Sequence, residues 1–513
     1  MHTAAPLQIV AFASTGDPLH ELGTLRQGEY LREYLSDLNA TSVLLEPSYF
    51  DRDYLSEFSA FYCASSAGYP NLCRRAHYFS EALDREALEA AVAADGPERA
   101  RFEASYLGFI VLRPIPKTPI GRTVLRWYPD ASPQLPRVVE PSREYACHVA
   151  GLTLRVTGLA WQQQDVGVGA CATVALWSML HSSAFDDRHV VPTTAEITRI
   201  GHGPGMSAYR AFPSRGLTFG QLVAAVRDSG FAPLVVPGNV TRPGNPGADR
   251  FSREHFSASL AAFIRSGYPV LVGGMLVDGQ TQRPIGRHAV CAVGFRQAMS
   301  GPQAQGTVQL EDAATEYVYI HDDNTGPAAR FKIDSDSSGA VVLRPSPPPP
   351  RNGRSAPGSS AAAPLFHPSA LLAAAHDDVR LSPDVLHSRA LELGGVLTTA
   401  TGGKLALTVS ARFTRLSQYV EAELETVLNR LPGTLGRTRL ALWERVPPMS
   451  LHLGVLRFGM GAAPLLDVLF DTTDSEPNMR AFCHVAYHPD VVTLVASVCN
   501  AVGYDLGPSI AAF

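Results

Sequence analysis

The sequence has very little lysine and none of the cysteine spacings that mark a zinc site. Only three of the 513 residues are lysine (Lys117, Lys332 and Lys404), so arginine supplies almost all of the positive charge, as in proteins of GC-rich bacterial genomes. The seven cysteines are scattered, odd in number and never arranged as CxxC, which argues against a disulfide framework or a zinc site. We therefore expect no metal, no cofactor and a reducing, cytoplasmic location.

Long apolar runs and an excess of basic charge are also missing. No run approaches the 18 or so residues of a membrane span, and the first residues lack the basic region of a signal peptide, so they predict a strand. The formal net charge is −5, which gives no basic field for nucleic acid. We expect a globular protein that binds neither nucleic acid nor membrane; its oligomeric state stays open.

The chain is too long for a single hydrophobic core, and changes in its composition and in the expected helices and strands divide it into parts. We predict an N-terminal α/β accessory domain over 1–105, a central domain over 106–345, a Pro/Gly/Ser/Ala linker over 346–364 and a C-terminal α+β accessory domain over 365–513. The first boundary moves to about 140 if the strands that start at Leu107 belong to the N-terminal part. In the C-terminal part we expect a helix over 417–431 and strands over 450–458, 464–471 and 483–498.

Residues 162–180 pass from a polar loop directly into a strongly apolar helix, with Cys171 at the junction. A helix start offers free N–H groups and the positive end of the dipole, which favour the nucleophilic thiolate. Gly167 and Gly169 let the loop turn tightly. Taken alone, the stretch favours a buried structural cysteine, because such cysteines are common.

A cysteine nucleophile needs a base and a group that orients the base. His288 begins the apolar strand 288–295, and Asp322 directly follows the strand 316–321. Each residue also has a purely structural interpretation: His288 as a histidine at a strand edge, and Asp322 as part of a turn. A calcium-binding loop that starts at Asp322 fits poorly, because Ile333 stands at the position where such a loop has glutamate. Cys291 lies three residues after His288, so it should face the opposite side of the strand and belong to the core.

An amide upstream of the cysteine could complete the set. The side chain of Gln162, Gln163 or Gln164, together with the Cys171 N–H, could stabilise an oxyanion. The sequence leaves open which glutamine does so.

The order of these residues resembles that of papain-like cysteine peptidases, closest to the bacterial branch that includes the double-glycine-leader peptidases. Within about 155–335 the similar phrases are GACATVALWSML, SRGLTFGQLVAAVRDSGF, SLAAFIRSGYPVLVGG, GRHAVCAVGF and YVYIHDDNTGP. The resemblance implies an α+β fold whose cysteine-bearing helix packs on an antiparallel sheet. It implies Cys171 as nucleophile, His288 as general base and acid, Asp322 as orienting residue and Gln164 as oxyanion donor. The chain departs from the family in having Asp165 six residues before the cysteine and Ala172 directly after it.

By this resemblance the chain is expected to be a cysteine peptidase-like hydrolase that cleaves a peptide or isopeptide bond through a thioacyl intermediate. Its partner would be a protein or peptide substrate whose identity the sequence leaves open. Two alternatives stand beside this one. The same triad could pass the acyl group to an amine or thiol, or the central domain could be a non-catalytic peptide-binding module.

Overall fold

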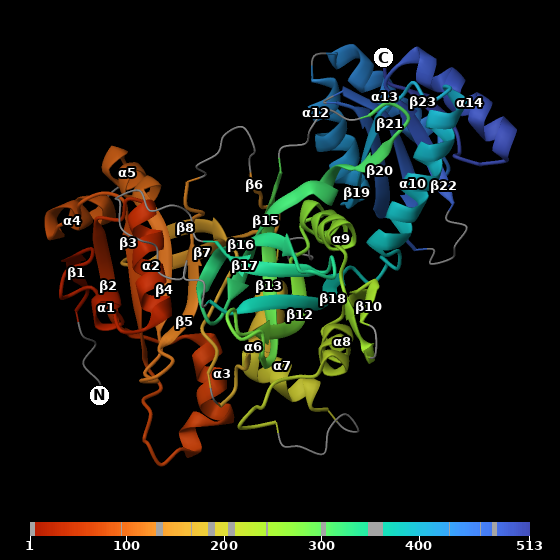
Figure 1. The fold of residues 1–513 in the computed structure, drawn as a ribbon. Coiled ribbons are helices and arrows are strands. Elements are labelled where there is room, and N and C mark those ends of the chain that lie inside the picture. The colour runs from red at the N-terminus through yellow and green to blue at the C-terminus, as the bar shows by residue number, and fades with distance from the viewer. Residues whose placement is uncertain are drawn as a thin grey trace.

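The computed structural model shows a mixed α+β protein built on several antiparallel sheets (Figure 1). Among the described helices, none combines the length and apolar character that a bilayer span requires. The structure describes residues 6–93, 95–129, 137–165, 167–182, 190–203, 211–242, 245–298, 304–346, 363–429, 431–461, 463–473 and 480–513.

The N-terminal unit is a five-stranded antiparallel sheet whose strands follow one another in chain order. Five helices connect and flank these strands, and α3 projects from the sheet toward α7 of the next unit (Figure 1). The strands are β1 (Gln8–Ala11), β2 (Ser42–Tyr49), β3 (Cys73–Phe79), β4 (Tyr106–Leu112) and β5 (Ile120–Leu125), and the helices are α1 (Pro18–Glu21), α2 (Arg26–Asp37), α3 (Arg52–Ala60), α4 (Arg85–Ala93) and α5 (Pro97–Ser105), with a 3₁₀ turn η1 (Tyr62–Ala64) after α3.

The boundary predicted at residue 105 is wrong. Strand β4 pairs with β3 along its whole length: Tyr106 lies opposite Phe79 at one end, and Leu112 lies opposite Arg74 at the other. Strand β5 pairs in turn with β4. All seven residues of β4 are buried, so the sheet cannot lose them without losing its core. The alternative boundary near 140 rests on these strands belonging to the N-terminal sheet, and β4 and β5 do so.

The central unit contains a small barrel. Strand β12 pairs with β13 on one side and with β18 on the other, so the ladder that runs through β15, β16 and β17 closes on itself. Strand β9 lies outside β18, and β6 pairs with β13. The strands are β6 (Arg137–Val138), β9 (Ala232–Pro237), β12 (Val270–Val277), β13 (Pro284–Gln297), β15 (Thr315–Asp322), β16 (Gly326–Ser335), β17 (Val341–Pro345) and β18 (Leu365–Ala375). The hairpin of β10 (Val240–Arg242) and β11 (Asn245–Arg250) contacts β18, whereas the hairpin of β7 (Arg143–Val149) and β8 (Leu152–Gly158) packs against β4 and β5 of the N-terminal sheet.

Helices cover the barrel on two sides (Figure 1). Helix α6 packs against β12 and β13, and α9 contacts the barrel and also the C-terminal unit. Helix α8 begins at a capping box formed by Thr218 and Gln221, which lie three residues apart in the sequence. These helices are α6 (Cys171–Met179), α7 (Thr194–Gly201), α8 (Phe219–Asp228) and α9 (Arg253–Arg265), and a 3₁₀ turn η2 (Glu311–Ala314) precedes β15.

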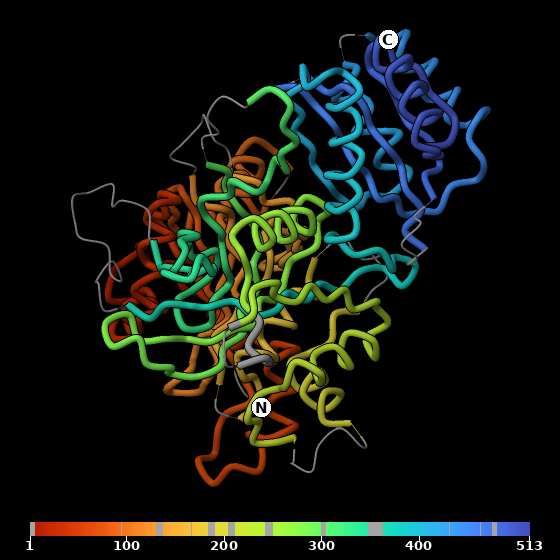
Figure 2. Tube along the Cα trace, turned by 45° about the vertical axis from the view of Figure 1, so that its right-hand side comes forward, coloured from red at the N-terminus to blue at the C-terminus, as the bar shows by residue number. Residues whose placement is uncertain are grey.

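The C-terminal unit is a sheet flanked by helices at the far end of the molecule from the N-terminus (Figure 2). Its strand order is β14-β19-β20-β21-β22-β23, and β14 comes from the central part of the chain. The strands are β14 (Val308–Leu310), β19 (Leu407–Arg415), β20 (His452–Met460), β21 (Ala463–Asp471), β22 (Ala481–Ala486) and β23 (Ser509–Ala511), and the helices are α10 (Pro383–Ala400), α11 (Leu416–Gln418), a π-helical turn η3 (Tyr419–Glu423), α12 (Leu424–Leu428), α13 (Pro432–Arg445) and α14 (Pro489–Val502).

Three expectations for this part differ from the structure. Strand β18, at residues 365–375, belongs to the barrel, so the C-terminal unit does not begin at 365. The strand expected over 483–498 stops at Ala486 and helix α14 begins at Pro489, because proline fits the first helical turn and the His488 side chain caps it. The helix expected over 417–431 is interrupted by η3. Of the linker expected at 346–364, residues 347–362 lie outside the described part of the chain.

Candidate active site

Cys171 is the first residue of α6 and is only partly buried. Its helix is buried on all sides from Ala172 to Met179, so the helix start is held rigidly against the barrel. The N-cap residue Ala170 provides no side-chain hydrogen bond. The first-turn N–H groups are therefore left without a capping side chain beside the thiol.

His288 lies in β13 between the thiol and a carboxylate. Its Nε2 is 3.1 Å from Oδ1 of Asp322, and its ring is also within hydrogen-bond reach of the Cys171 side chain. Burial by itself would lower the pKa of His288, but the hydrogen bonds to Asp322 and Cys171 and the charge of Asp323 raise it well above the ordinary histidine value. The site thus favours a protonated imidazole beside Cys171.

Asp322 ends β15 and is fixed by its own turn. Its Oδ1 accepts the Asn324 N–H at 3.1 Å, and its Oδ2 accepts the Thr325 hydroxyl at 2.8 Å. Burial would raise the pKa of Asp322, but the hydrogen bond to His288 and its positive charge outweigh burial, so the pKa lies below the ordinary value. Asp322 is therefore a charged acceptor held in place for the imidazole.

The two residues after Asp322 also face the imidazole. Oδ1 of Asp323 lies 3.5 Å from Nε2 of His288, and Nδ2 of Asn324 lies 3.3 Å from the same nitrogen. Burial, with the Asp322 carboxylate beside it, raises the pKa of Asp323 to about 7 in spite of the nearby His288 charge. In the sequence these two residues directly follow Asp322, where a carboxylate or an amide could also accept from the imidazole N–H.

The structure separates the three glutamines. Gln164 donates to the side-chain oxygen of Asn324 at 3.4 Å, which places it in the network around His288. Gln162 donates to Glu57, and Gln163 accepts the N–H of Ile120 through its side chain. Two of the three are thus used to hold the loop, and Gln164 is the one that reaches the residues around the imidazole.

Asp165, which stands where the resembled family has its glutamine, organises the loop before Cys171. Its Oδ1 accepts the backbone N–H groups of Gly167, Val168 and Gly169 at 2.7, 2.6 and 3.2 Å. A carboxylate that collects three N–H groups fixes a tight turn. The glycines at 167 and 169 supply the turn, as the sequence predicts, but the anchor is a residue that the sequence showed only as a departure.

A buried ion cluster of the N-terminal unit supports this anchor. Arg113 Nη1 lies 3.0 Å from Oε2 of Glu57 and 3.5 Å from Oδ2 of Asp165, and all three side chains are almost fully buried. Arg113 also donates to the carbonyl oxygen of Gln163 at 3.0 Å. Because one cation serves two buried carboxylates, burial raises the pKa of Glu57 to about 7 although Arg113 opposes it.

The N-terminal unit also holds the turn that carries Asp322. Gln27 and Tyr30 of α2 donate to the carbonyl oxygens of Asp323 and Pro327 at 3.0 and 2.9 Å. The ring of Tyr30 covers Gly326 so closely that a Cβ there would lie 2.1 Å from it. The candidate site is thus supported on both halves by residues that sequence reasoning assigned to an accessory domain without chemistry.

His288, Asp322 and Asp323 form a cluster with the geometry of a metal site, but hydrogen bonds explain this geometry without a metal. His288, Asp322 and Asp323 place one ligand atom each within 4.8 Å of the others. The hydrogen bonds that Asp322 accepts from His288, Asn324 and Thr325 already account for that carboxylate. Cys291 is fully buried on the other side of β13, which confirms the prediction that it belongs to the core.

No protein-family model matches this chain, and no curated protein matches it.

Proposed function

We propose that the protein is a cysteine hydrolase with a papain-like core that cleaves a peptide or isopeptide bond of a protein or peptide substrate. The observation that carries this proposal is the placement of His288 between the Cys171 thiol and the Asp322 carboxylate. A helix start, a strand and a strand end contribute one residue each. The combination of a nucleophile, a base and a residue that orients the base is the general pattern of covalent catalysis.

The first half of the reaction forms a thioester. Because Nε2 of His288 faces Asp322, the other ring nitrogen takes the thiol proton, and the thiolate attacks the substrate carbonyl carbon. The carbonyl electrons move onto oxygen, which the first-turn N–H groups of α6 and the Gln164 side chain stabilise. The intermediate then collapses, the C–N bond breaks, and the imidazolium gives its proton to the leaving amine.

The second half releases the acyl group. His288 removes a proton from water, the resulting hydroxide attacks the thioester carbon, and the C–S bond breaks. The thiolate then recovers its proton from the imidazolium, which leaves a free carboxylic acid and the starting enzyme. Asp322 keeps the imidazole oriented and stabilises its positive charge in both halves.

The test measures alkylation by iodoacetamide at pH 6 and pH 8.5, with each cysteine quantified by peptide mass spectrometry. Cys171 should react rapidly at pH 6, and His288→Ala should slow that reaction by about 10-fold or more, because the thiolate is the reactive form. Cys63 is exposed and unpaired with another cysteine, so it serves as an internal reference that His288→Ala leaves unchanged. A Cys171 rate that is the same with and without His288 would refute the proposal.

A second arm tests whether the Cys171 thiol attacks a carbonyl-directed probe. A peptide aldehyde or acyloxymethyl ketone should label the wild-type chain at Cys171, and Cys171→Ala should abolish the labelling. Undiminished labelling of that variant would also refute the proposal.

A further inference from the structure

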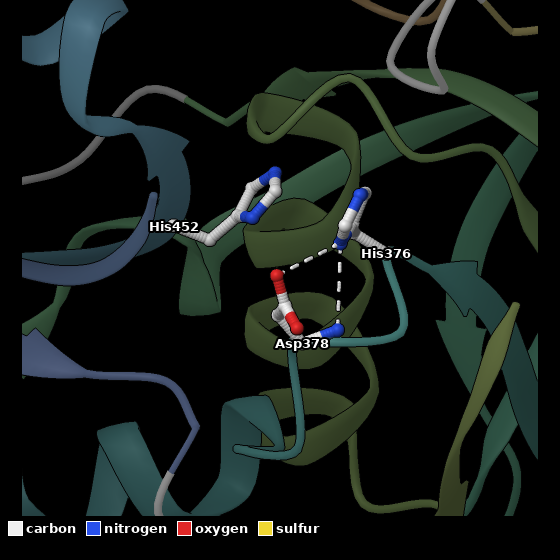
Figure 3. A group of neighbouring side chains, drawn as sticks. All are labelled: His376, Asp378 and His452. Atoms are coloured by element: carbon white, nitrogen blue, oxygen red, sulfur yellow. Dashed lines mark hydrogen bonds and ion pairs between the residues drawn. The ribbon is translucent and has the colours of Figure 1, made fainter. Parts of the chain in front are cut away.

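A second cluster of potential ligands lies where the barrel meets the C-terminal unit. His376 and Asp378 directly follow β18, and His452 is the first residue of β20 (Figure 3). One ligand atom from each residue lies within 4.8 Å of the other two. Figure 3 shows the three side chains converging from these separate segments.

His452 is the unusual member of the cluster. It is 5% exposed, and neither of its ring nitrogens has a hydrogen-bond partner in the described part of the chain. Buried polar atoms without partners are rare in native structures and point to a missing ion or ligand. Its ring lies 4.5 Å from the ring of His376, with an interplanar angle of 31°.

The charges around the cluster suit a cation. Asp378 contributes one carboxylate, and Oδ1 of Asp377 lies 2.9 Å from Nδ1 of His376. Arg415 is the positive charge that opposes this arrangement. Neutral imidazole, with a free ring nitrogen, is the form of histidine that binds a metal.

We propose that His376, Asp378 and His452 bind a divalent transition-metal cation of the zinc class. Two imidazoles and one carboxylate suit Zn²⁺ better than Mg²⁺ or Ca²⁺, which take mainly oxygen ligands. Ligand bonds of about 2.0–2.2 Å require the three side chains to draw together, and His376 and Asp378 are exposed enough to rotate. The side chains of His376 and Asp378 are 35% and 51% exposed.

The bound cation would cross-link two units of the molecule. His376 and Asp378 lie at the end of a barrel strand, whereas His452 lies in the C-terminal sheet. Three protein ligands also leave a fourth position for water. The site is independent of Cys171 and of the hydrolase proposed above. It contains no cysteine, whereas the sequence-based argument against a zinc site considered only the spacing of the cysteines.

The experiment uses the full chain, freed of metal with a chelator and dialysed against buffered Zn²⁺. Metal analysis should find one zinc per chain at this site. His376→Ala and Asp378→Asn should each raise the Zn²⁺ dissociation constant by about 100-fold or more, because loss of even an outer partner of a metal ligand costs 10–100-fold. Co²⁺ in place of Zn²⁺ should give the visible absorption of a four-coordinate site, and His376→Ala should remove it.

His488→Ala is the matched control. His488 and Asp490 form an exposed pair with the same spacing as His376 and Asp378, 3.6 Å apart, but with no second histidine in a described metal-ligand cluster. This variant should bind zinc like the wild type. Because His452 is buried, His452→Ala is informative only if that variant folds. The outcome is therefore decided by His376→Ala and Asp378→Asn, which replace exposed side chains.

Three results would overturn the proposal. They are a wild-type chain that binds no zinc, zinc binding unchanged in both His376→Ala and Asp378→Asn, and zinc lost only when His288→Ala removes the other histidine–carboxylate group.

Discussion

Arg113 is the residue whose replacement tests most directly how the N-terminal unit supports the candidate active site. Methionine at this position keeps an unbranched apolar chain but removes the cation between Glu57 and Asp165 and the donor to the Gln163 carbonyl oxygen. Removing one partner of a buried ion pair costs about 3–5 kcal/mol, since the remaining charge stays buried. We expect Arg113→Met to lower the free energy of unfolding by about this amount at pH 8.

The cost should be smaller at pH 5.5. The pKa of Glu57 is raised to about 7 even with Arg113 present, and loss of the cation raises it further. At pH 5.5 Glu57 therefore carries a proton, and only Asp165 remains as an uncompensated charge.

Urea unfolding followed by tryptophan fluorescence measures this effect, because Trp161 is fully buried and donates to the Asp322 carbonyl oxygen at 3.1 Å. Alkylation of Cys171 should slow in the same variant, because the Asp165 turn before the thiol loses its support. The matched control is Arg457→Met, which strips a fully buried carboxylate, Asp467, of its arginine in the C-terminal sheet. That control should destabilise the protein and leave Cys171 reactivity unchanged. A cost below about 1 kcal/mol for Arg113→Met, or an equal loss of Cys171 reactivity in both variants, would refute the reasoning.

Three further predictions follow from the same contacts. Burial raises the folded-state pKa of Glu57 to about 7, above its unfolded value, so its contribution to stability is complete below pH 4.5 and is lost as pH rises through 7. Urea unfolding of Glu57→Gln should therefore show a free energy of unfolding that rises by about 1–3 kcal/mol relative to the wild type between pH 5 and pH 8. A difference between the two proteins that does not change with pH would contradict this. Asp322→Asn should lower the pKa of the paired imidazole, seen in an NMR titration, and reduce turnover of any substrate found by about 10²–10⁴-fold; an unmoved titration would show that the carboxylate does not hold that ring. Gly326→Ala should cost about 1–3 kcal/mol in thermal unfolding, because its Cβ would lie 2.1 Å from the Tyr30 ring, whereas Gly339→Ala, also at positive φ but with nothing within 4 Å, should cost less; equal costs would rule out the Tyr30 contact as the cause.

Local signals in the sequence predicted local structure well. Contacts between residues a few positions apart can be recognised in a sequence, such as the capping box at Thr218 and the cap at Asp84, whose carboxylate accepts the Ala87 N–H at 2.8 Å. The position of Cys171 at a helix start follows from the same kind of signal. Helix α14 was missed because its β-branched, apolar run favours a strand, and burial against the sheet decided otherwise.

Pairings between distant segments could not be predicted in this way. Glu57 and Arg113 are 56 residues apart, and Gln162 is 105 residues from Glu57. In the sequence each of these residues looks like an ordinary polar residue of a helix, strand or loop. The assignment of β4 to the N-terminal sheet is of the same kind, because the pattern of a strand does not reveal its neighbour.

The crossing of strands between the barrel and the C-terminal sheet determines how firmly these two parts of the molecule are joined. Strand β14 leaves the central part of the chain to pair with β19, and β18 lies beyond residues 347–362 yet closes the barrel against β12. The part of the chain before 347–362 therefore supplies β14 to the C-terminal sheet, and the part after it supplies β18 to the barrel, each held by main-chain hydrogen bonds. A proteolytic cut within 347–362 would leave two fragments that stay associated, because separating them would require breaking both ladders.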